Sequence, residues 1–121
     1  MSDEYNITLV DDLILEVTQS SLYPQLLTQL QKDIDRAGID YKIDPEIQPK
    51  DLITTINKLL LSVLQHTFNE YLNLLYAVDV SEAEIRNFKS EKAEDIAGYA
   101  TYLILKREWK KVWYRNQLRK L

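Results

Sequence analysis

Cysteine is absent from this chain of 121 residues, and glycine, proline and histidine occur only two, three and one times. Without cysteine, the protein cannot form disulfides, attack a substrate with a thiolate, or hold zinc or an iron–sulfur cluster through sulfur. So few glycines and prolines also provide little material for the many tight turns of an all-β fold. These shortages favour a helical protein.

Long hydrophobic runs are missing as well. Uncharged apolar runs such as residues 59–69 and 96–105 are well short of the roughly 20 residues that a membrane span requires. The first residues, MSDEYNITLVDD, are acidic and lack the basic start and apolar run of a signal peptide. Together with the lack of cysteine, these features predict a soluble, cytoplasmic protein that forms a single domain over residues 1–121.

Hydrophobic residues make up 45% of the chain and charged residues 28%, which is ordinary for a globular domain. The apolar residues recur at spacings of three and four, which is the period of an amphipathic helix. We therefore expect an all-α fold, a small helical bundle with three main helices at residues 22–37, 49–77 and 91–119. Two shorter helices are expected at residues 10–18 and 81–88, and an extended connector at residues 39–48.

Local signals mark several helix ends. Gly38 follows the first main helix, where a left-handed residue commonly ends a helix, and Pro49 opens the second. Ser81 and Glu84 have the spacing of a capping box, which starts a new helix. Ser90 offers a further cap, so we expect a break just before the last main helix.

Two segments leave an alternative open. Within residues 1–20, Leu13 and Val17 have helical spacing but also alternate as in a strand, and we favour a short helix. Residues 39–48 alternate between apolar and polar side chains and could form a short strand, although Pro45 interrupts them.

The net charge of −4 conceals a strong asymmetry. The last sixteen residues, KREWKKVWYRNQLRKL, hold seven of the fifteen basic side chains and one acid, whereas residues 1–105 hold eight bases and eighteen acids. This basic, aromatic segment at residues 106–121 can bind an external anion, or it can fold back onto the carboxylates of its own chain. Asp33 with Asp35, or Asp11 with Asp12, are the expected internal partners.

The primary interpretation is that the last helix contacts protein. Its apolar side chains fall within two arcs on opposite sides of the helix: Leu103, Tyr114, Leu118 and Leu121 form one, and Leu105, Trp109, Val112 and Trp113 form the other. Large aromatic residues and arginine are enriched at protein interfaces. We expect the helix to bury the second arc in a homodimer or against a protein partner, so that the protein acts by contact and not by catalysis. The predicted interface residues are Leu105, Trp109, Val112 and Trp113.

The alternative interpretation is electrostatic. Basic residues interleaved with aromatic rings are typical of surfaces that bind nucleic acid or an anionic membrane. The residues that would bind the anion are Lys106, Arg107, Lys110, Lys111, Arg115, Arg119 and Lys120. Such binding would weaken steeply as the salt concentration rises.

Catalytic and metal-binding patterns are weak. His66 and Glu70 lie one helical turn apart, but two ligands are too few for a metal site. The acids near the predicted helix starts are explained by the helix dipole, and no glycine-flanked nucleophile or glycine-rich phosphate loop is present. We therefore expect no enzyme, no metal, no cofactor and no small-molecule substrate.

One segment has a family resemblance. YLNLLYAVDVSEAEI, from Tyr71 to Ile85, resembles a segment of small, all-helical bacterial proteins without an assigned activity. The resemblance covers fifteen of the 121 residues. It implies a helical fold and transfers no functional residue.

Overall fold

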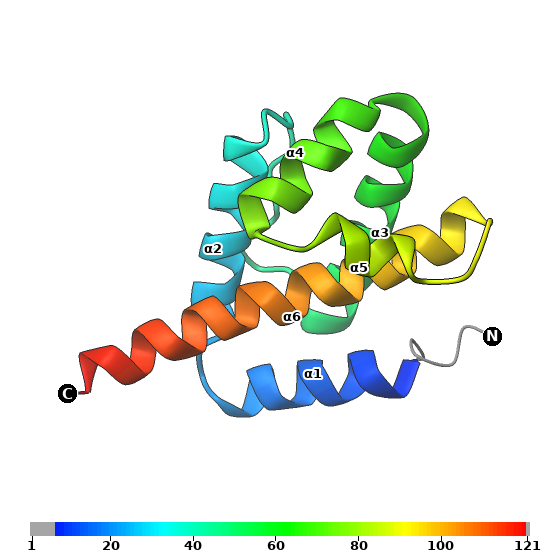
Figure 1. Cartoon of the computed structure of the whole chain (residues 1–121). Coiled ribbons are helices and arrows are strands. Elements are labelled where there is room, and N and C mark those ends of the chain that lie inside the picture. Colours follow the sequence, from blue (N-terminus) through cyan, green and yellow to red (C-terminus); the bar gives the residue numbers. More distant parts are fainter. Residues whose placement is uncertain (1–6, 121) are drawn as a thin grey trace.

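The computed structural model describes residues 7–120, which form helices and connecting turns and contain no strand (Figure 1). The expected all-α bundle is confirmed. In chain order the helices are α1 (Ile7–Gln19), α2 (Tyr23–Arg36), α3 (Pro49–His66), α4 (Phe68–Val78), α5 (Glu82–Arg86) and α6 (Ala93–Arg119).

The predicted end of α2 and start of α3 are confirmed. Gly38 has a φ of 80°, and its N–H donates to Asp35 O at 3.0 Å. The N–H of Ile39 reaches back to Ile34 O at 3.2 Å, so the last carbonyls of α2 are satisfied. Pro49 lies in the first turn of α3. The connector between α2 and α3 forms neither helix nor strand, which removes the strand alternative for residues 39–48.

The prediction of one helix over residues 49–77 is wrong, because the chain turns at Thr67. This residue leaves the helical region at φ −141° and ψ 68°, so α3 ends just before it and α4 begins just after it. Its N–H donates to Val63 O, and its carbonyl accepts the N–H of Glu70 at 2.8 Å. A continuous helix of roughly 40 Å would carry its last apolar turns past the core. The turn instead folds α4 back against α3 and α2.

The remaining helices lie close to their predicted ranges, but α6 begins after Lys92 and Ser90 does not cap it. The first segment is a helix, α1, and not a strand. Ser81 caps α5 by accepting the N–H of Glu84 at 3.4 Å, as a capping box predicts. The expected break before the last helix is present, because α5 ends at Arg86 and α6 begins at Ala93.

Helix α6 crosses the middle of the molecule and contacts each of the other five helices (Figure 1). Its apolar stretch from Ala97 to Leu105 is almost entirely buried, and small residues within it allow neighbouring helices to approach closely. Helix α1 lies along one side of α6 and runs in the same direction, while the last turns of α6 extend past α2. The most deeply buried aliphatic side chains of the bundle are Val17, Leu26, Leu30, Ile34, Leu52, Ile56, Leu60, Leu74, Val78, Ile104 and Leu105.

Candidate functional site

The structure divides the predicted interface residues between the interior and the surface. Leu105, Trp109 and Val112 are buried within the chain's own core. The side chain of Trp113 stays 41% exposed and meets the ring of Tyr114 edge-on, with 5.5 Å between the ring centroids. The large apolar side chains that stay exposed on the last turns of α6 are therefore Trp113 and two residues that were not in the predicted set, Tyr114 (55% exposed) and Leu118 (68% exposed).

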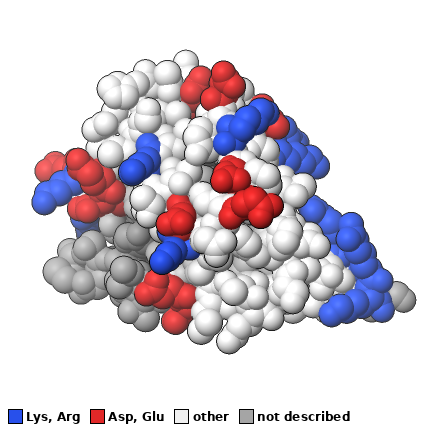
Figure 2. Space-filling model, turned by 180° about the vertical axis from the view of Figure 1, so that it is seen from behind, with Lys and Arg blue, Asp and Glu red and all other residues white. Residues whose placement is uncertain are grey.

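The predicted anion-binding residues are also divided. Arg107 donates to Asp79 at 3.0 Å, and Arg115 donates to Gln29 Oε1 at 2.8 Å. Lys111 is mostly buried and is described below with the carboxylates that it contacts. Arg115 is exposed despite its hydrogen bond to Gln29, and the other exposed basic residues of this segment are Lys106, Lys110, Arg119 and Lys120. Figure 2 shows basic side chains gathered at the end of the molecule where α6 ends.

A buried polar network joins α2 to α6. The side chains of Asp33 and Glu108 are completely buried. Lys111 Nζ lies 2.9 Å from Asp33 Oδ2 and 2.9 Å from Glu108 Oε1. Gln29 Nε2 donates to the same Asp33 oxygen at 3.0 Å, and Arg115 in turn donates to Gln29. The internal pairing of the basic terminus with Asp33, expected from the sequence, is therefore present.

The two carboxyl groups of this network have opposite pKa shifts. Burial, and then the hydrogen bond to Asp33, raise the pKa of Glu108 to about 9, although Lys111 opposes the shift. Burial would also raise the pKa of Asp33, but hydrogen bonds from Glu108, Lys111 and Gln29 outweigh it and lower that pKa. At neutral pH, Asp33 is thus ionised and Glu108 is neutral. The proton on Glu108 supplies a hydrogen-bond donor for Asp33, whose Oδ1 otherwise has no hydrogen-bond partner.

The sequence interpretation missed Glu108 and Gln29. Glu108 is the one acid among the last sixteen residues, and it lies three residues after Leu105 and four before Val112, so it shares a helical face with both. An acid on the buried face of a helix needs a partner or a proton, and this position was the available signal. No comparable signal marks Gln29, because nothing in the sequence distinguishes it from the other glutamines of α2.

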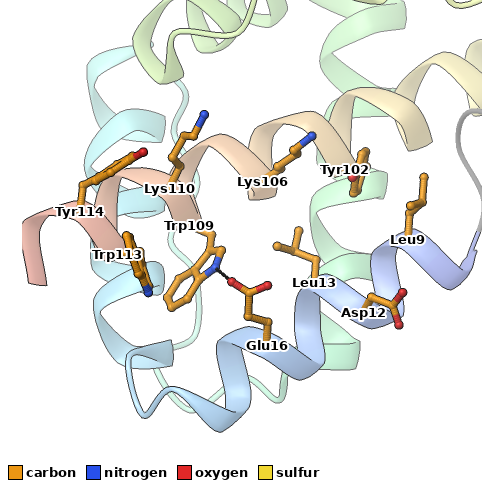
Figure 3. A pocket seen from close by; sticks show the side chains of 10 residues that line it. All are labelled: Leu9, Asp12, Leu13, Glu16, Tyr102, Lys106, Trp109, Lys110, Trp113 and Tyr114. Atoms are coloured by element: carbon orange, nitrogen blue, oxygen red, sulfur yellow. Dashed lines mark hydrogen bonds between the residues drawn. The ribbon is translucent and has the colours of Figure 1, made fainter. Parts of the chain in front are cut away.

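An open groove of about 460 Å³ runs between α1 and α6 (Figure 3). At the base of the groove, Trp109 Nε1 donates a hydrogen bond to Glu16 Oε2 at 2.7 Å, which connects the two helices. The side chain of Leu13 points from α1 into the space between the helices. The apolar residues that line the groove are Leu9, Leu13, Tyr102, Trp109, Trp113 and Tyr114.

The two rims of this groove carry opposite charges. Asp12 and Glu16 lie on α1, and Lys106 and Lys110 lie on the far edge of α6 (Figure 3). The ammonium group of Lys106 also lies 5.7 Å from the ring centroid of Tyr102, within range of a cation–π interaction. The groove is therefore apolar at its base, acidic on one side and basic on the other.

The remaining candidates are not brought together. His66 ends α3 and Glu70 lies in α4, so the turn at Thr67 breaks their helical spacing, and Glu70 Oε1 instead lies 3.2 Å from the hydroxyl of Thr67. Within residues 7–120, no group of three or more His, Asp or Glu side chains could hold a metal ion. None of the helices described here is long and apolar enough to cross a membrane.

Comparisons with protein-family models, with curated proteins and with solved structures found no match to this chain.

Proposed function

We propose that this protein acts in the cytoplasm by non-covalent protein–protein contact, without catalysis or a cofactor. The contact surface is the exposed apolar end of α6, made by Trp113, Tyr114 and Leu118, together with the adjoining α1/α6 groove. The observation that carries the proposal is the exposure of these three side chains on the last turns of one helix.

Two properties of this surface support the proposal. Large aromatic side chains that are partly buried and held by a rigid helix are efficient binding anchors, because little conformational entropy is lost when a partner covers them. The ring of Trp113 also meets the ring of Tyr114 edge-on, so a partner that covers one of these rings can contact both. The groove continues the apolar surface between α1 and α6, so the area available for contact exceeds three side chains.

The proposal is tested by the double substitution Trp113→Ser/Leu118→Ser. The molar mass of wild type and variant is measured by size-exclusion chromatography with light scattering at tens of micromolar, and complexes are captured by chemical crosslinking. We expect association of the wild type and at least about a tenfold weakening in the variant, since removing an aromatic anchor commonly costs that much.

Tyr76→Ser provides the matched control. Tyr76 is 90% exposed on α4, so its loss removes an aromatic ring from the surface without touching α6. The control should associate like the wild type. A strictly monomeric wild type that captures no partner, or equal weakening by the control, would contradict the proposal.

Electrostatic binding of nucleic acid or an anionic membrane is the second candidate. Its support is the group of exposed bases at the end of α6 (Figure 2). Arg119 is the last residue of this helix and Lys120 follows it directly. The engagement of Arg107 and Lys111 with acids of the same chain reduces the charge available to a ligand. Titration of a mixed-sequence oligonucleotide and of anionic vesicles at low and high salt tests this candidate, with Arg119→Gln/Lys120→Gln as the variant. A flat titration at low salt removes it.

A further inference from the structure

We infer that the α1/α6 groove binds a second copy of this chain, with α1 of each copy lying over α6 of the other. This inference rests on the proposed function, because it names the partner that the surface around Trp113 contacts. The pattern of charges on the two rims of the groove is the main argument.

Both rims repeat their charge at the same interval. Asp12 and Glu16 are four residues apart on α1, and Lys106 and Lys110 are four residues apart on α6, so each pair spans about 6 Å of its helix. The two helices lie side by side and run in the same direction, so the acidic row and the basic row are roughly parallel (Figures 1 and 3). A partner that complements both rows needs a basic row opposite the acidic row of α1 and an acidic row opposite the basic row of α6. The charges in each row of the partner must also repeat at the same interval.

A second copy meets this requirement when its groove faces the first across a two-fold axis parallel to the groove. That rotation keeps the direction of the helices and exchanges the two sides, so α1 of one copy lies over α6 of the other. Asp12 then faces Lys106 and Glu16 faces Lys110, twice in each dimer. A two-fold axis across the groove would instead place acid over acid and base over base, which is unfavourable.

The apolar residues of the groove fit the same arrangement. Trp109 and Leu13 form its base, and Trp113 stands at one end with 41% of its side chain exposed. In the two-fold arrangement these residues lie between the charged rows and are covered by the corresponding surface of the second copy. An apolar centre enclosed by paired charges is the usual anatomy of a specific interface.

A polyanion is a poorer occupant of this groove. The rims together carry two acids and two bases, so a phosphate chain placed against Lys106 and Lys110 would also approach Asp12 and Glu16. A purely apolar helix would offer no opposite charge to Asp12, Lys106 or Lys110. The charge pattern therefore favours a surface that carries both signs, as this chain does.

The test exchanges one charge pair between two variants, Lys106→Glu and Asp12→Lys. Both residues are exposed, and neither takes part in the hydrogen bond between Trp109 and Glu16. Each variant alone would place like charges opposite each other at two symmetric positions. A mixed dimer of the two variants has opposite charges at both positions. At one position the introduced acid faces the introduced lysine, and at the other the unchanged Asp12 of one copy faces the unchanged Lys106 of the other.

Sedimentation equilibrium gives the dissociation constants, and native mass spectrometry distinguishes the mixed dimer from both homodimers. We expect dimerisation of the wild type, at least about a tenfold weaker dimer for each variant, and recovery of nearly wild-type affinity in the equimolar mixture. The double variant Asp12→Lys/Lys106→Glu in one chain should also dimerise, because its two charges are simply exchanged.

Three results would overturn the inference. The first is a dimer whose dissociation constant is unchanged by either single variant but that is lost in Trp113→Ser/Leu118→Ser. In that case the proposed function would hold, but the two copies would contact each other in a different arrangement. The second is a monomeric wild type with no mixed dimer, whose crosslinked partner is a different protein. The third is a monomer that binds oligonucleotides or anionic vesicles, which would remove the proposed function as well.

Discussion

Replacing Glu108 by glutamine is expected to stabilise this protein at neutral pH. In the folded chain the carboxyl group is buried beside Asp33, and its pKa is raised to about 9 from an ordinary value of 4.5. At pH 7 the unfolded chain therefore carries an ionised Glu108, and folding must bind a proton. Each pH unit above the unfolded pKa adds about 1.4 kcal/mol to this cost until the folded pKa is reached, so the cost at pH 7 is about 3 kcal/mol.

Glutamine removes this cost and keeps the important contact. Its amide can donate a hydrogen bond to Asp33, as the protonated acid does, and its carbonyl can accept one from Lys111. Glutamine is never ionised, so the unfolded state no longer gains from releasing a proton. We expect the free energy of unfolding at pH 7 to rise by about 1–3 kcal/mol, which allows for imperfect amide geometry.

The pH dependence of the free energy of unfolding distinguishes the variant from the wild type more clearly than the stability at a single pH. A pKa that is higher in the folded state makes a contribution to stability that is complete below the unfolded pKa and is lost as pH rises to the folded pKa. The contribution of Glu108 should therefore decline between about pH 4.5 and pH 9 in the wild type, and this decline should be absent in the variant. The lowered pKa of Asp33 affects stability only at more acidic pH, so it does not interfere.

Urea denaturation followed by far-ultraviolet circular dichroism at several pH values in this window measures both quantities. Glu94→Gln, which changes an exposed acid in the first turn of the same helix, is the control and should keep the wild-type slope. The reasoning is refuted if Glu108→Gln is less stable than wild type at pH 8 and retains the same decline with pH.

Three further predictions concern other parts of the molecule. Lys111→Met should lower the free energy of unfolding by about 3 kcal/mol in urea titrations, because it leaves a buried carboxylate without its cation. Gly38→Ala should cost about 1 kcal/mol in the same assay through its φ of 80° alone, since nothing lies within 4 Å of the added methyl group. Trp113→Phe should leave an emission spectrum from Trp109 that is shifted to shorter wavelength and is poorly quenched by acrylamide, whereas Trp109→Phe should give the reverse. Similar quenching of both variants would contradict the burial described here.

The helical class and several helix ends were predictable because local chemistry decides them. Gly38 adopts the left-handed conformation that ends α2, and Ser81 caps α5 through the spacing read in the sequence. The turn at Thr67 was not predicted, because no glycine or proline marks it and the apolar pattern continues through it. Thr67 and Glu70 do have the spacing of a capping box, but inside a strongly periodic segment that signal is outweighed.

The candidate site was predictable only in part. The apolar arc of the last helix was recognised, but a helical wheel cannot tell whether an arc faces its own core or a partner. Trp109 and Trp113 are four residues apart on the same arc, yet one is buried against α1 and the other is exposed. That difference depends on where α1 ends, which is a tertiary property. The neutral state of Glu108 likewise depends on Asp33, a residue 75 positions earlier in the chain.

The position of α6 in the sequence also has a consequence for biosynthesis. Ribosomes release a chain from its N-terminus onward at about 5–20 residues per second. The five helices made first all pack on α6, so during synthesis they present an incomplete apolar core for several seconds. The bundle can therefore close only after residue 112 has been made, so the core is completed late in synthesis.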